Sequence, residues 1–186
     1  THGTGCTLAS ALATGLGRGF GIEKAFEQAI SFVRQNASRW KIDPEKIGIM
    51  GFSAGGHLAS TAATRFNKPM IEDSKANLRP DFLILGYPVI SFSDSVGHLG
   101  SRDNLLGKSA SREKVQEYSN ELQVTTETPP TFLFHASDDK GVLPANSIAF
   151  FESLLRHNVP AELHIYERGG HGFGMDNPTT DEKWMN

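Results

Sequence analysis

A serine lies at the centre of a G-x-S-x-G pattern, directly after an apolar run. Residues 48–56 read Gly-Ile-Met-Gly-Phe-Ser-Ala-Gly-Gly, which predicts a tight strand-to-helix turn that holds the Ser53 hydroxyl clear of its own backbone. We expect Gly51 and Gly55 to flank the bend so closely that any side chain there would collide with the turn. The N–H of Ala54 would face the oxyanion that forms when the serine attacks a carbonyl.

A serine hydroxyl is a poor nucleophile unless a base accepts its proton and a third group orients that base. Asp138 and Asp139 follow a predicted strand at 131–136, and His171 follows another at 161–166. The three residues occur along the chain in the order serine, acid, histidine. This is the order found in enzymes whose nucleophile lies on such a strand-to-helix turn. Because parallel strands end at a common edge of the sheet, we expect these three groups to meet there.

The choice between the two aspartates depends on the alternation of side chains along extended chain. Asp139 lies four residues after His135 and clears the end of the predicted strand. Asp138 would point to the opposite side of the extended chain from Asp139. We therefore favour Asp139 as the acid and keep Asp138 as the alternative.

The other histidines and the glycine-rich segment at 15–19 lack the context of a site. His57 lies on the predicted helix after the elbow and His135 lies inside a strand, so both are expected to pack or hydrogen-bond structurally. No histidine pair has the spacing of metal ligands. Residues 15–19 follow no predicted strand and lack the third glycine of a dinucleotide site. No metal or cofactor is predicted.

Short apolar runs alternate with helical periodicity from Ile22 onward, which predicts an α/β domain with a parallel sheet and helices on both faces. Residues 1–21 are Gly-rich and irregular. We expect strands at 47–50, 82–85, 131–136 and 161–166, helices at 22–40, 55–65, 112–122 and from 144 onward, and a surface excursion at 91–110.

The composition is that of one globular domain. The chain has 186 residues, of which 38% are hydrophobic and 21% charged, and its net charge is −3. That charge, without a basic stripe, argues against a nucleic-acid partner. No apolar run reaches membrane-spanning length, so no membrane partner is expected. The single cysteine, Cys6, allows no disulfide within the chain and no cysteine-built zinc site.

Three segments carry a specific resemblance: 51–59 around the serine, 129–139 with the aspartates, and 169–174 around His171. They resemble the α/β-hydrolase superfamily, and most closely its carbohydrate-esterase-like branch of acetylxylan and feruloyl-type esterases. The similarity covers about residues 22–186. The resemblance implies Ser53 as nucleophile, Asp139 as acid, His171 as base and the Ala54 N–H as one oxyanion donor.

The chain departs from that family at its start. Family members carry further strands and an H-G-G-G-like loop, which supplies the second oxyanion donor, ahead of the helix that begins here near Ile22. The counterpart here is His2-Gly3-Thr4-Gly5, to which we assign no donor. We expect 1–21 to be an irregular segment and 22–186 a truncated α/β-hydrolase core. The strand at 47–50 would then be an open edge that self-associates or pairs with residues 1–21.

These features predict a serine esterase that hydrolyses short acyl esters of a small molecule or carbohydrate through an acyl-enzyme. The resemblance implies acetyl groups on plant cell-wall carbohydrate such as xylan. Two alternatives stay open: a serine peptidase of the prolyl-oligopeptidase type, and an inactive truncated hydrolase that acts only by association.

Overall fold

Four parallel strands form the centre of the chain. The computed structural model describes residues 21–69, 71, 77–181 and 184, so the segment predicted to be irregular at 1–21 lies, except for Gly21, outside the described residues. The strands are β1 (Ile49–Phe52), β2 (Leu83–Gly86), β3 (Thr131–Ala136) and β4 (Ala161–Tyr166), and they lie side by side in sequence order. Their parallel pairing confirms the predicted sheet.

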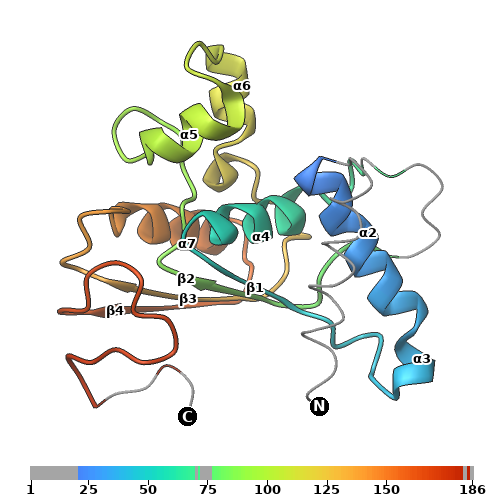
Figure 1. Cartoon of the computed structure of the whole chain (residues 1–186). Helices are drawn as coiled ribbons and strands as arrows, with labels where there is room; N and C mark the ends of the chain where they lie inside the picture. Colours follow the sequence, from blue (N-terminus) through green and yellow to red (C-terminus); the bar gives the residue numbers. More distant parts are fainter. Residues whose placement is uncertain (1–20, 70, 72–76, 182–183, 185–186) are drawn as a thin grey trace.

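In the part of the chain that the structure describes, the helices that cover the sheet lie over one of its faces, whereas the sequence predicted helices on both. The helical elements are α2 (Ile22–Gln35), α3 (Ala37–Trp40), α4 (Ala54–Arg65), α5 (Leu99–Leu106), α6 (Arg112–Glu117), the 3-10 turn η1 (Asn120–Leu122) and α7 (Ala145–Arg156). Figure 1 shows α4 and α7 lying across the sheet, with α5 and α6 stacked beyond α4. None of the helices in the described ranges combines the length and apolarity needed to cross a bilayer.

The two faces of the sheet bury different side chains. Beneath α4 and α7 lies an aliphatic core that includes Leu83, Leu85, Leu133 and Leu154. The opposite face carries an aromatic cluster made by Tyr87, Phe134, Tyr166 and Trp184, with Phe52, Phe132 and Phe173 packed against it. Trp184 stacks on Phe134 with ring centroids 4.3 Å apart. Burial on both faces explains why β2 and β3 are short apolar runs. β4 instead alternates, and its Glu162 and His164 are exposed.

Several boundaries differ from the prediction. The predicted helix 22–40 divides at Asn36, whose side-chain amide donates to the Phe32 carbonyl and caps α2. β1 begins two residues late because the Ile47 N–H donates to Asp81 Oδ2 instead of entering the ladder. The predicted helix 112–122 is interrupted after Glu117.

The predicted surface excursion at 91–110 contains a helix, α5, whose residues are all exposed or half-buried. Apolar periodicity signals a helix through its buried face, and α5 has no such face. The sequence therefore predicts only a surface excursion here, and the structure shows that it is partly helical.

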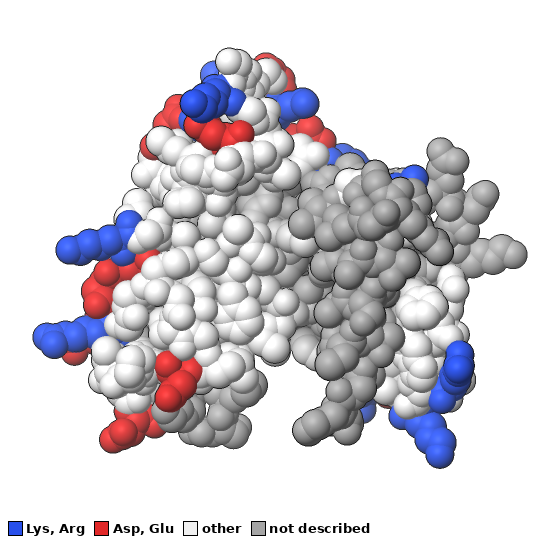
Figure 2. Space-filling view, in the orientation of Figure 1, with Lys and Arg blue, Asp and Glu red and all other residues white. Residues whose placement is uncertain are grey.

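Within the described residues, β1 is an edge of the sheet. Met50 on this strand has 48% of its surface exposed. Association at this edge stays a prediction. On the face in Figure 2, acidic and basic side chains are interspersed near the outline, and the surface between them is uncharged.

The turn after β1 is packed most tightly at Gly51. A Cβ placed there would lie 2.7 Å from the Gly55 carbonyl carbon and 2.8 Å from Ala59 Cβ. The expectation for Gly55 is wrong, because a Cβ there meets no described atom within 4 Å. Gly55 is exposed at the start of α4, and Gly56 is the glycine that α4 packs closely, against Pro88.

We predict that Gly51→Ala lowers the free energy of unfolding by about 2 kcal/mol, since overpacking a tight site costs about 1–3 kcal/mol. The matched variant Gly55→Ala should leave stability unchanged or raise it by less than about 1 kcal/mol, because alanine favours a helix over glycine. Urea denaturation of both variants makes the comparison. Equal losses would contradict the packing described for this turn.

Candidate active site

Ser53 is the residue that joins β1 to α4. Its backbone has φ +52° and ψ −124°, a conformation that costs a non-glycine residue about 1–3 kcal/mol. The surrounding chain holds it there: the Ser53 N–H donates to the Gly86 carbonyl and the Ser53 carbonyl accepts from the Val89 N–H, both at 3.0 Å. The turn after β2 thus fixes the elbow.

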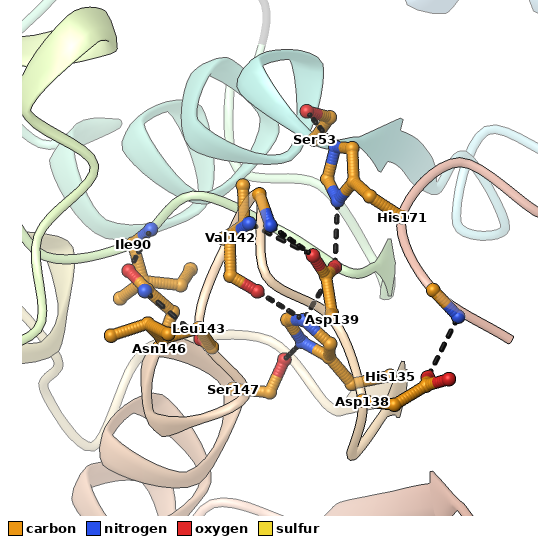
Figure 3. A network of polar contacts seen from close by, with 12 residues as sticks. Ser53, Ile90, His135, Asp138, Asp139, Val142, Leu143, Asn146, Ser147 and His171 are labelled. Carbon is orange, nitrogen blue, oxygen red and sulfur yellow. Dashed lines mark hydrogen bonds and ion pairs between the residues drawn. The ribbon is translucent and has the colours of Figure 1, made fainter. Parts of the chain in front are cut away.

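A chain of hydrogen bonds starts at the Ser53 hydroxyl (Figure 3). Ser53 Oγ lies 2.8 Å from His171 Nε2, and His171 Nδ1 lies 2.6 Å from Asp139 Oδ2. The ionised carboxylate can only accept, so Nδ1 carries the ring proton and Nε2 is left to accept the serine hydroxyl. The three side chains come from the loops after β1, β3 and β4, at the carboxyl edge of the sheet.

The Asp139 carboxylate is fully buried and saturated with donors. Its Oδ1 accepts the N–H groups of Gly141 and Val142 at 2.8 and 2.9 Å. Burial raises the pKa of the Asp139 carboxyl, but hydrogen bonds from His171, Val142 and Gly141 outweigh burial and hold that pKa below its usual value. The group is therefore ionised at neutral pH.

Asp138 contacts the backbone of the loop that carries His171. Its Oδ1 accepts the Gly170 N–H at 2.8 Å, one residue before His171. The structure thus brings Asp139 to the imidazole and places Asp138 on the backbone that carries it (Figure 3).

The His171 loop is held at further points. Gly174 N–H donates to Tyr87 Oη at 3.0 Å, and Trp184 Nε1 donates to the Gly174 carbonyl at 3.1 Å. The Tyr87 ring meets the His171 ring edge-on, with centroids 4.9 Å apart. Gly170 adopts φ +62°, a left-handed conformation that glycine takes at little cost.

His57 has the structural role expected from the sequence. Its ring stacks on Phe92 at 4.3 Å, and its Nε2 lies 2.8 Å from the Tyr118 carbonyl. Burial lowers its pKa to about 4, so the ring is neutral and donates to that carbonyl.

Sequence reasoning missed the contacts of His135. This residue is buried as expected, but its Nε2 lies 3.1 Å from Asp139 Oδ2 and its Nδ1 lies 2.8 Å from Ser147 Oγ. The separation of four residues between His135 and Asp139 was the available signal.

A cavity of about 250 Å³ opens beside the elbow. Its wall comes from the first turns of α4, from Phe92 and from α5, and is mainly apolar. The lining residues are Ala54, His57, Leu58, Thr61, Phe92, Ser101, Asn104 and Leu105.

Two expectations concern groups around the serine. Ala54 is the first residue of α4 and is exposed, which places its N–H at the positive end of the helix dipole. His2 and Gly3, to which no second oxyanion donor was assigned, lie outside the described residues. In the described ranges, no cluster of three or more His, Cys, Asp or Glu residues is arranged to hold a metal ion.

Comparisons with known proteins relate the chain to a family. A model of the BD-FAE family matches residues 23–154. The acetylxylan esterase of Xylanibacter ruminicola is 39% identical over 80% of this chain and 30% of its own length. Endo-1,4-beta-xylanase B of Butyrivibrio fibrisolvens is 36% identical over 84% of this chain and 25% of its own length.

A solved structure extends the likeness to three dimensions. The acetyl ester-xyloside bifunctional hydrolase from Caldicellulosiruptor lactoaceticus superposes with a TM-score of 0.75 at 43% identity, covering 80% of this chain and 56% of that one. The chain spans less than a third of the two curated relatives above. Its parallel sheet, its strand–elbow–helix turn and these matches show that the chain has the α/β-hydrolase fold and belongs to the BD-FAE family.

Proposed function

We propose that this chain carries the active site of a serine esterase that hydrolyses short-chain acyl esters. The single observation that carries the proposal is the continuous set of hydrogen bonds from Ser53 through His171 to Asp139. An imidazole with its Nδ1 proton fixed on a buried carboxylate presents its Nε2 lone pair to the hydroxyl, as proton transfer from a nucleophile requires.

The reaction proceeds in two halves. Ser53 Oγ attacks the ester carbonyl while His171 Nε2 takes its proton, and the resulting imidazolium is stabilised by Asp139. The C–O bond to the alcohol then breaks, and Nε2 returns the proton to the leaving oxygen. A water attacks the acyl-enzyme in the same manner, releases the acid and restores the serine.

The oxyanion formed in each half needs donors that are already in place. The Ala54 N–H, at the start of α4, is the proposed donor. The strained backbone of Ser53 supports this role, because the same turn exposes both the hydroxyl and the next N–H.

We further propose that the substrate carries acetyl or similarly short acyl groups on plant cell-wall carbohydrate such as xylan. The names of the relatives support this choice, since one is an acetylxylan esterase and another a xylanase. The apolar cavity beside Ala54 supports a place for the acyl group, next to the proposed oxyanion donor.

We predict that Ser53→Ala reduces hydrolysis of p-nitrophenyl acetate by at least about 10⁴-fold, because the nucleophile is lost. Ser109→Ala, an exposed serine, is the control and should match the parent. A prolyl p-nitroanilide peptide, tested beside the ester, should not be cleaved. Preference for the peptide would favour the peptidase alternative, and inactivity of the parent chain would favour the inactive one.

Exchanging each aspartate for asparagine separates their roles. Asp139→Asn should lower kcat by about 10⁴-fold, since an amide cannot hold His171 in the required tautomer. Asp138→Asn should lower kcat less than about 10-fold, because its side chain supports only the Gly170 N–H. Steady-state kinetics on p-nitrophenyl acetate decides, and a larger loss in Asp138→Asn would reverse the assignment.

Filling the cavity should shorten the preferred acyl chain. Leu105→Trp should lower kcat/KM for p-nitrophenyl hexanoate about 10-fold relative to the acetate, since each buried methylene contributes about 0.8 kcal/mol. Leu122→Trp is the control, because Leu122 is 60% exposed and does not line the cavity. If the ratio of kcat/KM between the two esters were unchanged in Leu105→Trp, the cavity would not be the site that binds the acyl chain.

A further inference from the structure

The hydrogen-bonded chain continues beyond Asp139 into the core. His135, on β3, has none of its side chain exposed. Its Nε2 lies 3.1 Å from Asp139 Oδ2 and 2.9 Å from the Val142 carbonyl, and its Nδ1 lies 2.8 Å from Ser147 Oγ on α7. In Figure 3 the imidazole lies between the carboxylate and the serine.

These neighbours fix where the protons of His135 lie. Both groups at Nε2 are acceptors, an ionised carboxylate and a peptide carbonyl, so Nε2 must carry hydrogen. Burial lowers the pKa of His135 and keeps the ring neutral, which leaves Nδ1 with a lone pair. The Ser147 hydroxyl must therefore donate to His135 Nδ1, and His135 Nε2–H must donate to Asp139.

The carboxylate shares one oxygen between two imidazoles. Asp139 Oδ2 accepts from both His171 Nδ1 and His135 Nε2, while Oδ1 accepts two backbone N–H groups. Together these four donors fill the acceptor positions of a carboxylate. A donor at Oδ2 from His135 restrains the rotation of the carboxylate and draws charge away from the oxygen that binds His171.

We propose that His135 is a positioning residue for Asp139, held in its Nε2–H form by Ser147, and that it sets how strongly Asp139 attracts the proton of His171. This inference rests on the proposed function. Among the described residues, Tyr87, from the loop after β2, is a further titratable group close to this carboxylate, and its ring also contacts His171. Asp138 is engaged by the Gly170 N–H.

Two amide variants separate the contacts of His135. Glutamine can place its amide nitrogen near the position of Nε2 and keep a donor toward Asp139, whereas asparagine reaches only the position of Nδ1. We expect His135→Asn to lower kcat about 10-fold to 100-fold with little change in KM, because misplacing a catalytic group by about 1 Å can cost 10²-fold. His135→Gln should recover most of that loss.

The acid limb of the kcat/KM profile gives a readout that a merely structural role would not move. Without the His135 donor, Asp139 attracts the imidazolium proton of His171 more strongly, so activity should be lost at a higher pH. In His135→Asn we expect the midpoint of this limb to rise by about 0.5 to 1 pH unit. In His135→Gln the midpoint should stay near that of the parent.

A pair of serines on α7 tests the same inference without touching the histidine, which matters if His135→Asn does not fold. Ser147 and Ser153 are both buried, and Ser153 Oγ donates to the Glu121 carbonyl at 2.7 Å, away from the site. Ser147→Ala should lower kcat several-fold, about 3-fold to 10-fold, and raise the acid midpoint. Ser153→Ala should do neither, although each variant removes the hydrogen bond of a buried serine.

Labelling of Ser53 with a fluorophosphonate distinguishes a failure of the proposed function from a failure of the inference about His135. If the parent chain is not labelled, the proposed function fails and this inference fails with it. If the parent is labelled but Ser147→Ala and Ser153→Ala show the same kcat and acid midpoint, only the positioning role of His135 is overturned. A parent-like acid midpoint in folded His135→Asn would overturn it equally.

Discussion

The buried negative charge of Asp139 is the constraint on which the rest of the site depends. An ionised carboxylate inside a protein is stable only if donors replace the water it has lost. Here those donors are two backbone N–H groups of its own loop, His135 of β3 and His171 of the loop after β4. The contacts that stabilise the charge are thus the contacts that aim the imidazole at Ser53.

The sheet makes this arrangement possible across a large sequence distance. Ser53 and His171 are separated by 118 positions, yet both follow strands that end at the same edge. Phe52, Gly86, Phe134 and His164 lie in one line across the four strands. The site therefore depends on the parallel register of the strands. The strained backbone of the elbow is stabilised by the end of β2, by the turn after it and by the first turn of α4, whose Gly56 N–H donates to the Ser53 carbonyl.

Much of this could be predicted from the sequence where local signals were strong. β3 and β4 have the predicted bounds because a proline directly precedes each strand and apolar residues recur through both. The helix break at Asn36 depends on a side-chain cap, and the late start of β1 depends on a bond to Asp81 from a distant loop. Neither a single side-chain cap nor a contact with a distant loop leaves a periodic pattern in the sequence.

The contacts of His135 escaped prediction because burial of a histidine in a strand does not reveal its partners. The proposed esterase activity requires that Ser53 is a reactive nucleophile. Intact-protein mass spectrometry after fluorophosphonate treatment tests this most directly. We expect one phosphonyl group per chain, mapped to the peptide that contains Ser53. An unmodified chain, or a label on another residue, would contradict it.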